Sequence, residues 1–385
     1  MANIMDYVAW RGDLSFRKSC VNEVDVVILS QIVMMDLRSC VPTHGAVQLS
    51  DCAKSYFMLK PEEPHIGFII PETINDLFDA MAHSVRFSGL LLSNYIEDID
   101  KDVETQFSAL TVDAPDVHTR FVVFSGTDDT IVGWKENFNL IYKTPTNAQL
   151  QSVKYLNAAA RDYHGKIIVL GHSKGGHLAI YAAANSEAET RRMITGVFNM
   201  DGPGFPEDDK QTRLFATVER RVVTLLPQSS IIGKLFSHGE RNRIVHSTAK
   251  GLFQHDCFSW QVMGTQFLEE SKFTKEAVAL ETGLKSILAD MKLEERETCV
   301  EAIFALLYRT KCNTLTELAA SGVEFVRAYM SLPSEQKSAV NRVVKTFMHD
   351  KYLRKNILET SAVLTKMSMS NKEVKKLKQM KSEKE

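Results

Sequence analysis

The stretch that decides the fold is KIIVLGHSKGGHLAIYAAAN, residues 166–185. Near its start, residues 167–170 form a continuous β-branched and apolar run of the kind found in buried parallel strands. Its end, residues 176–185, carries the small apolar side chains of a helix that packs on a sheet. The turn between them, GHSKG at 171–175, matches the G-x-S-x-G pattern of a nucleophile elbow, in which a serine hydroxyl is exposed at a strained strand-to-helix turn.

Two glycines give this turn its expected shape. Without a Cβ at Gly171 and Gly175, the strand and the helix can approach closely while Ser173 adopts an unfavourable backbone conformation. A pattern this short also arises by chance, so the alternative is a structural turn that happens to contain a serine. The strand before it and the helix after it favour a functional elbow with Ser173 as the nucleophile.

The composition is that of an ordinary globular protein. A chain of 385 residues predicts one sizeable domain plus a smaller one, and a net charge of -2 gives no reason to expect nucleic-acid binding. No apolar run approaches the roughly 18 residues of a membrane span, and the N-terminus carries charge where a signal peptide is apolar. The cysteines lack C-x-x-C or zinc-site spacing, which predicts reduced thiols, no metal and a cytoplasmic protein. They are Cys20, Cys40, Cys52, Cys257, Cys299 and Cys312.

The hydrophobic period changes along the first 265 residues. Helices are predicted at 24–37, at 73–87 with Thr73 or Asn75 as the cap, at 147–163 and at 176–185. Strands are predicted at 90–100, 104–112, 119–127, 166–170, 194–200, 221–226 and 243–247, with a turn at 113–116. A strand meander followed by an alternating β/α half predicts a mixed sheet with helices on its faces, as in α/β-hydrolases.

Strand signals stop near residue 266, where a helical C-terminal region is expected to begin. We predict a hydrolase domain at 1–265, a helical region at 266–360 and a lysine-rich frayed helix or tail at 361–385. For the tail a solvated end is favoured, and peripheral membrane contact is the alternative. We expect two amphipathic helices of this region to pack within the chain near the active site. The alternatives are that they pair with each other or form a dimer contact. Their stripes are Val300, Ile303, Phe304 and Leu307, and Val340, Val343, Val344 and Phe347, with a capping-box pattern at 314–317 between them.

A serine hydroxyl needs an imidazole to take its proton and a carboxylate to orient that imidazole. In α/β-hydrolases these groups follow in the order Ser, acid, His, each at the carboxyl end of a strand. The predicted strand 194–200 ends at Asp201 and breaks at once in Gly-Pro-Gly, which makes Asp201 the candidate acid, with an ordinary strand-end turn as the alternative.

His255 is the candidate base among eleven histidines, because it lies in the loop after the final strand and follows both the serine and the acid. His172 is fixed inside the elbow, His177 points one helical turn away and His246 lies within a strand. Asp256, next to His255, is the second-choice acid or a hydrogen-bonding loop residue.

Acyl transfer also needs donors for the developing oxyanion. One is usually the amide of the residue after the nucleophile, which is Lys174 here. The second is expected after an earlier strand, where Thr127 offers both an amide and a hydroxyl. An ordinary polar turn at residues 125–129 is the alternative.

Seven segments of the chain occur together in a fixed order, namely MDYVAWRGDLSF, LSNYIEDID, FSGTDDTIVGWKENF, GHSKGGHLAIYAA, NMDGPGF, LLPQSSIIG and GLFQHDCFSW. Together they resemble an uncharacterised, mostly bacterial family of α/β-hydrolases related to class 3 (fungal-type) lipases. The resemblance covers roughly residues 1–265 and implies a class 3 lipase-like fold, with Ser173 as nucleophile, His255 as base and Thr127 at the oxyanion position.

Two departures from the lipase pattern concern the site. Ser125 stands where the lipases have an arginine, which removes a charged partner from that loop. The lipase acid precedes a proline-rich segment, and the matching stretch here, TLLPQSS at 224–230, contains no acid. Asp201 resembles instead the acid that some other lipases place one strand earlier.

These residues predict a serine hydrolase of carboxylic esters, plausibly lipid or other acyl esters, that works through an acyl-enzyme and needs no cofactor. The residues leave ester, thioester and amide bonds open, and they leave the oligomeric state open. A different class of function is a catalytically silent hydrolase fold that serves as a binding or regulatory module. The acid missing from the lipase position favours that alternative, whereas the serine and histidine at strand ends oppose it.

Overall fold

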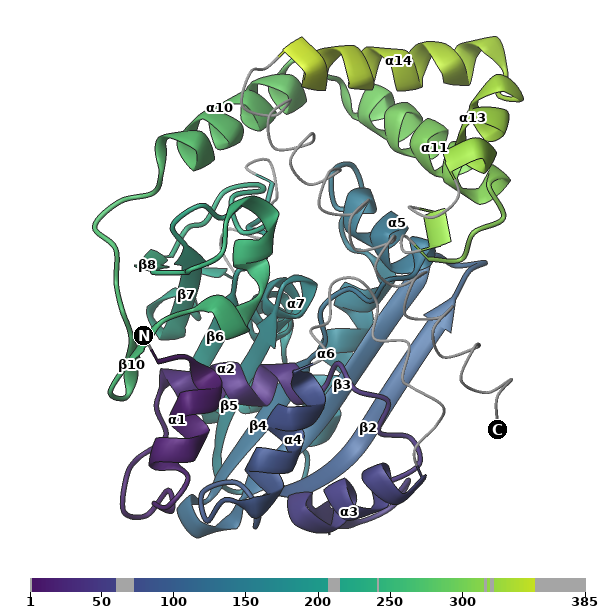
Figure 1. The fold of residues 1–385 in the computed structure, drawn as a ribbon. Coiled ribbons are helices and arrows are strands. Elements are labelled where there is room, and N and C mark those ends of the chain that lie inside the picture. Colours follow the sequence, from purple (N-terminus) through teal and green to yellow (C-terminus); the bar gives the residue numbers. More distant parts are fainter. Residues whose placement is uncertain are drawn as a thin grey trace, which may run out of the picture. The chain divides into compact units, whose positions relative to one another are not determined.

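The structure is a computed structural model that describes residues 2–59, 73–206, 215–240, 242–314, 317–318 and 322–349 (Figure 1). The chain divides into two compact units, Met1–Asp128 with Val132–Glu281 and Asp129–Ile131 with Thr282–Glu385. The unit boundary follows Glu281, later than the position expected from the end of the strand signals. The predicted tail at 361–385 lies outside the described residues.

An eight-stranded sheet forms the centre of the first unit, with its strands in sequential order from β1 to β8. Strands β1 to β4 are antiparallel neighbours, and β4 to β8 are parallel neighbours. The strands are β1 Ala46–Gln48, β2 Leu91–Asp100, β3 Thr105–Ala114, β4 Thr119–Phe124, β5 Lys166–His172, β6 Ile194–Met200, β7 Val222–Pro227 and β8 Asn242–Val245, and a separate pair is β9 Val262–Met263 and β10 Gln266–Phe267. This meander joined to a parallel half is the predicted mixed sheet.

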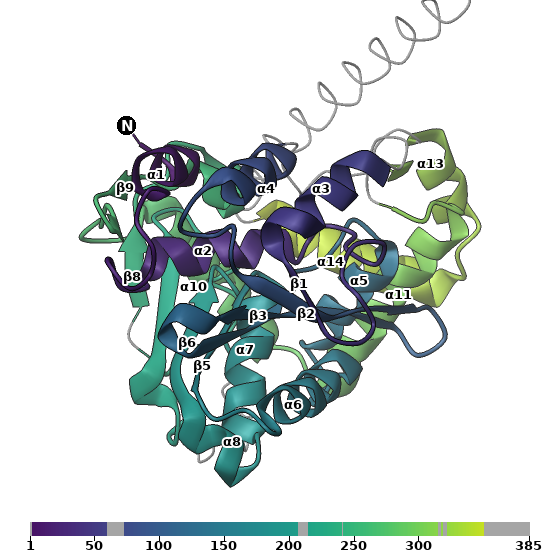
Figure 2. The same ribbon diagram turned by 90° about the horizontal axis from the view of Figure 1, so that it is seen from below.

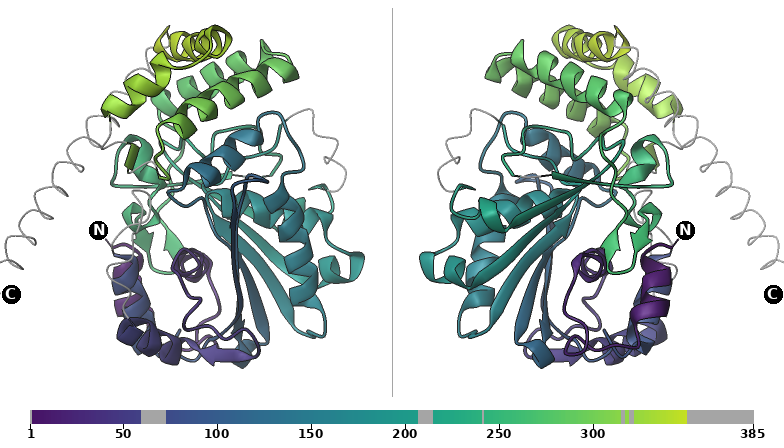
Figure 3. Two further views of the ribbon diagram at one scale, coloured as in Figure 1. Left: turned by 90° about the vertical axis from the view of Figure 1, so that its right-hand side faces the viewer. Right: turned by 90° about the vertical axis from the view of Figure 1, so that its left-hand side faces the viewer.

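Helices cover both faces of the sheet, as Figures 2 and 3 show from below and from the sides. Those of the first unit are α1 Ile4–Arg11, α2 Glu23–Ile32, α3 Leu49–Leu59, α4 Ile74–His83, α5 Ile131–Asn139, whose first residue belongs to the second unit, α6 Asn147–Ala160, α7 Lys174–Asn185 and α8 Ala188–Met193. Helices α1 and α2 on one face and α6 and α7 on the other lie on opposite sides of the strands (Figure 2). The layered α/β-hydrolase arrangement predicted from the sequence is confirmed.

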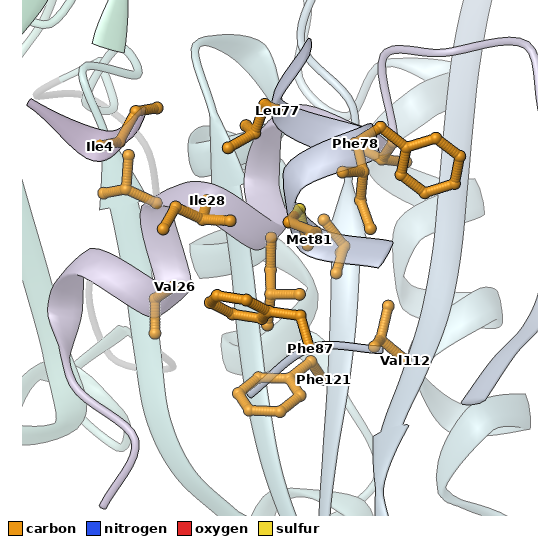
Figure 4. Close-up of a cluster of buried hydrophobic side chains, with 14 of the residues drawn as sticks. Ile4, Val26, Ile28, Leu77, Phe78, Met81, Phe87, Val112 and Phe121 are labelled. Carbon is orange, nitrogen blue, oxygen red and sulfur yellow. The ribbon is translucent and has the colours of Figure 1, made fainter. Parts of the chain in front are cut away.

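Alternation along the strands divides the apolar core into two layers. In β4, Phe121 and Val123 belong to the core under α1 to α4, whereas Val122 and Phe124 belong to the core under α6 and α7. This is the period of two expected when both faces of a sheet are covered. Figure 4 shows the first core, where side chains from α2 and α4 meet Phe121.

A buried ion pair ties the N-terminal helices to the segment that precedes β2. Arg86 donates from Nη2 to Oδ2 of Asp25 over 2.5 Å and from Nε to Oδ1 over 2.6 Å, and both side chains are fully buried. Further donors of Arg86 reach the carbonyls of Leu14, Ser19 and Cys20. The local periodicity of the sequence could not predict this ion pair, because its partners are 61 positions apart.

Several helix ends differ from the sequence expectation: α4 ends at His83 rather than at residue 87, and α6 ends at Ala160 rather than at residue 163. Helix α2 ends at Ile32 rather than at residue 37, and it begins with a capping box between Asn22 and Asp25. Thr73 precedes α4, but its side chain makes no cap hydrogen bond, and Asn75 accepts from the Tyr56 hydroxyl instead. Thr73 thus occupies the predicted N-cap position of α4 without a side-chain hydrogen bond, and Asn75 is not the cap. No helix or strand was predicted from the sequence for the short elements α1, β1 and α3.

The second unit is helical. Its elements are α10 Lys275–Ala289, which begins in the first unit, α11 Leu293–Arg309, α13 Gly322–Met330 and α14 Ser334–His349. The apolar cluster that joins α11, α13 and α14 contains Ala302, Leu306, Ala328, Leu332, Ala339 and Val340. Helix α11 thus uses a stripe next to the predicted one, although Val300 and Phe304 are also buried. The side chains of Val343, Val344 and Phe347 lie outside the described residues, and packing of these helices near the active site stays a prediction.

Candidate active site

The serine of the GHSKG turn lies between the end of β5 and the start of α7. Ser173 has φ 58° and ψ -131°, a strained conformation for a residue with a Cβ. A Cβ on Gly171 would lie 2.2 Å from the Gly175 carbonyl carbon, and one on Gly175 would lie 2.1 Å from the Phe124 oxygen. Both glycines are therefore required by contact with backbone, as the sequence pattern predicted.

The candidate acid directly follows β6. Asp201 has φ 50°, and its side chain is only 1% exposed. Its Oδ2 lies 2.6 Å from Nδ1 of His255, and its Oδ1 accepts from Ser230 Oγ at 2.5 Å and from the Gly233 amide at 3.2 Å. The carboxylate is thus held from one side and aimed at the imidazole from the other.

The candidate base ends the short 3-10 turn Gly251–His255. His172, the residue before Ser173, has its Nε2 2.8 Å from the His255 carbonyl oxygen, and the two rings lie 4.4 Å apart. Burial, followed by the electrostatic effect of the neighbouring His255, holds the pKa of His172 well below its ordinary value, so His172 is a neutral donor to that carbonyl. These contacts bring the imidazole of His255 against the elbow.

Within the described residues, Ser173 Oγ makes no hydrogen bond to His255. Catalytic hydrogen bonds are often long or poorly aligned before a substrate binds. Ser173 is 9% exposed, so its side chain is close to fully enclosed.

The other weighed residues are occupied elsewhere. Asp256 accepts from the Phe258 amide at 2.9 Å as the cap of the next 3-10 turn, and burial raises its pKa. His177 bonds Gln149 and the carbonyls of residues 203 and 204, and burial lowers its pKa to about 4. His246 lies 2.6 Å from Glu270. Of the two carboxylates considered, the structure brings Asp201 to His255.

The candidate oxyanion donors lie on two adjoining segments. Lys174 is the first residue of α7, where backbone amides have no partner within the helix. A Cβ on Gly126 would lie 3.2 Å from the Ser173 Cβ, which places the loop of Thr127 against the elbow. The Thr127 hydroxyl accepts from Nδ2 of Asn137 in α5, and that bond does not consume its proton.

Sequence reasoning did not anticipate the residues that support this site. Ser230 holds the acid, and Asn137 orients Thr127. Ser230 lies in the segment LLPQSSIIG, which resembles the family, but the resemblance did not predict its contact with Asp201. Asn137 lies in another of these segments, FSGTDDTIVGWKENF, and nothing else in the sequence indicated its contact with Thr127.

The arrangement contains a nucleophile in a strained turn, an imidazole beside it and a buried carboxylate on that imidazole. These are the parts that acyl transfer requires. In the part of the chain that the structure describes, no cluster of His, Cys, Asp and Glu has the geometry to hold a metal ion. No described helix is long and apolar enough to cross a membrane.

Several solved lipase structures are similar to this chain at low identity. The lipase–propeptide complex of Rhizomucor miehei is 17% identical over 44% of this chain and 58% of its own, with a TM-score of 0.32. Lip2 lipase of Yarrowia lipolytica is 12% identical over 41% and 66%, with a TM-score of 0.31. The lipase of Rhizopus microsporus var. chinensis is 13% identical over 63% and 88%, with a TM-score of 0.31.

The aligned part spans less than two thirds of the Rhizomucor and Yarrowia chains. No curated protein sequence matches the chain. The pattern of the Mbeg1-like family matches residues 81–305, more than half of the 385 residues and all three members of the candidate triad. The chain therefore belongs to the Mbeg1-like family.

Proposed function

We propose that this protein is a serine hydrolase that cleaves carboxylic esters through a Ser173–His255–Asp201 triad. The observation that carries the proposal is the 2.6 Å contact between Asp201 Oδ2 and His255 Nδ1 beside the strained elbow of Ser173. A buried carboxylate on Nδ1 fixes the tautomer in which Nε2 accepts a proton. That tautomer is the one a serine nucleophile requires.

The chemistry proceeds in two halves. His255 Nε2 takes the Ser173 proton as Oγ attacks the ester carbonyl, and it returns that proton to the leaving alcohol when the acyl-enzyme forms. Water, deprotonated by the same imidazole, then attacks the acyl carbonyl, and the acid is released as the bond to Ser173 Oγ breaks and the imidazolium returns the proton to that oxygen. The Lys174 amide and Thr127 are the proposed donors to the oxygen that becomes negative.

The proposed substrates are acyl esters, with lipid esters the leading class, and no cofactor is needed. The fold and the family resemblance support this class more than any contact does. Cys20, Cys40, Cys52 and Cys257 form no disulfide in the structure, which supports the proposal that the protein works in the reducing cytoplasm.

A silent hydrolase fold that acts as a binding module is the second candidate. One observation favours it, namely the absence of a hydrogen bond between Ser173 Oγ and His255 among the described residues. The two candidates differ in a property that can be measured directly, because only an activated serine reacts rapidly with a phosphonylating agent.

The test is labelling of the full-length protein with a fluorophosphonate probe, together with hydrolysis of short p-nitrophenyl esters. Wild type should label, whereas Ser173→Ala should not, and His255→Ala should lose at least roughly 1,000-fold in kcat. The matched control is His164→Ala, because His164 is exposed and precedes the opposite end of β5. A wild type that neither labels nor turns over ester would leave the binding module as the function.

A further inference from the structure

The side chain of Lys174 is buried although it follows the nucleophile at the mouth of the elbow. It is 3% exposed, and its Nζ donates to the Gln106 carbonyl, to Gln106 Oε1 at 2.5 Å and to Glu136 Oε2 at 3.2 Å. An ammonium has three donors, and all three are used. This group therefore has no lone pair and no spare proton to offer to Ser173.

A buried charge is retained only where its partners are fixed, because desolvation is costly for an unpaired ion. Glu136 is 1% exposed and also accepts from the Gln106 amide at 3.0 Å and from the Ala148 amide at 2.8 Å. The ion pair thus joins the first residue of α7 to the start of β3, to α5 and to the start of α6. An apolar side chain at 174 would fill the space without connecting these elements.

The same network reaches the loop that carries the other proposed oxyanion donor. Gln106 Nε2 donates to the Gly126 carbonyl at 3.4 Å, one residue before Thr127. Asn137, the neighbour of Glu136 in α5, donates to the Thr127 hydroxyl. The network therefore holds the side chain of Lys174 directly, and it holds Thr127 through the preceding Gly126 carbonyl and the neighbouring Asn137.

We propose that the Lys174 ammonium is a positioning residue that, through Gln106 and Glu136, fixes the Lys174 amide and Thr127 relative to each other as one oxyanion hole. This inference rests on the proposed function, but it concerns a role that the nucleophile-elbow pattern does not give to this side chain. Oxyanion donors act only when they are aimed at the position that the charged oxygen will occupy. A displacement of about 1 Å in such a site can cost on the order of 100-fold in rate.

The test compares Lys174→Met with the double variant Lys174→Met/Glu136→Gln. The single variant leaves a buried carboxylate unpaired, whereas the double variant has no unpaired charge and keeps the fold accessible if the single variant fails to fold. The matched control is Lys166→Met, because Lys166 is an exposed lysine at the other end of β5. Each protein is assayed for kcat and KM on a short p-nitrophenyl ester and for inhibition by an alkyl boronic acid.

The double variant should lose roughly 10- to 100-fold in kcat with KM within about threefold of wild type, since the donors act in the transition state. The boronic acid, which mimics the tetrahedral intermediate, should bind more weakly by the same factor. Adding Thr127→Val to the double variant should cost far less than it costs wild type, because residues that act as one unit are not additive. A variant with wild-type kcat and only a lower Tm would overturn the proposal.

A readout independent of catalysis separates this inference from the proposed function. Hydrogen exchange measured by mass spectrometry should be faster in the double variant within peptides that cover residues 104–108, 124–138, 146–150 and 172–178, with the rest of the first unit unchanged. Unchanged exchange in these peptides would overturn the network even if the enzyme is active. An inactive wild type with the localised change would overturn the hydrolase proposal alone and support the connection.

Discussion

Replacing Asp201 by Asn tests the candidate triad most sharply, because the carboxylate is held in an asymmetric setting. Its Oδ1 accepts from the Gly233 amide and from the Ser230 hydroxyl, while Oδ2 faces His255 Nδ1. A hydroxyl can reverse and become an acceptor, but a backbone N–H cannot. The Gly233 amide therefore decides which way an asparagine side chain turns.

An asparagine oxygen should take the place of Oδ1 and leave its NH₂ group facing His255. The opposite orientation would set two N–H groups against each other at Gly233 and would cost about 1–3 kcal/mol. His255 Nδ1 must then accept, which places the proton on Nε2, where it blocks transfer from Ser173. The wrong tautomer together with the lost negative charge should lower kcat by about 10,000-fold, or about 5 kcal/mol.

The assay is initial-rate hydrolysis of p-nitrophenyl butyrate by Asp201→Asn, with Asp256→Asn as the matched control. Asp256 only caps a 3-10 turn through the Phe258 amide, and asparagine caps as well as aspartate, so this control should stay within about threefold of wild type. A loss below tenfold in Asp201→Asn would refute the argument. So would a larger loss in Asp256→Asn, which would move the acid there.

Three further outcomes are expected. Thr127→Val should lower kcat by about 100-fold with little change in KM, and an equal change in KM would indicate a binding role instead. Gly171→Ala should destabilise the fold by more than about 3 kcal/mol in urea unfolding, because its Cβ would lie 2.2 Å from backbone, whereas Gly89→Ala meets nothing within 4 Å and should be close to neutral. Burial lowers the pKa of His177 from 6.5 to about 4. Between these pH values the unfolded chain binds a proton at His177 that the folded protein does not. About 3 kcal/mol of the free energy of unfolding, present above pH 6.5, is therefore lost as the pH falls to 4. The loss of unfolding free energy between pH 7 and pH 4 should be about 3 kcal/mol smaller in His177→Gln than in wild type. An equal loss in both proteins would contradict the lowered pKa of His177.

Local sequence was sufficient for the elements that carry the chemistry. The strand, turn and helix of residues 166–185 follow from hydrophobic period and two glycines, and the structure has them as β5, the elbow of Ser173 and α7. Asp201 was placed by the end of its strand. Parallel strands bring their carboxyl ends to one edge of a sheet, so chain order alone predicts that such residues meet.

The choice between neighbouring side chains was settled only by tertiary contacts. His255 lies in a 3-10 turn without any period, and the side on which its ring finds a carboxylate depends on the Ser230 and Gly233 loop. The local sequence pattern likewise did not predict the partners of Thr127 and Lys174, which come from α5 and β3. The physical reason is range: hydrophobic period and backbone strain act over a few residues, whereas a buried hydrogen bond or ion pair is satisfied by whichever group the packed chain brings within about 3 Å.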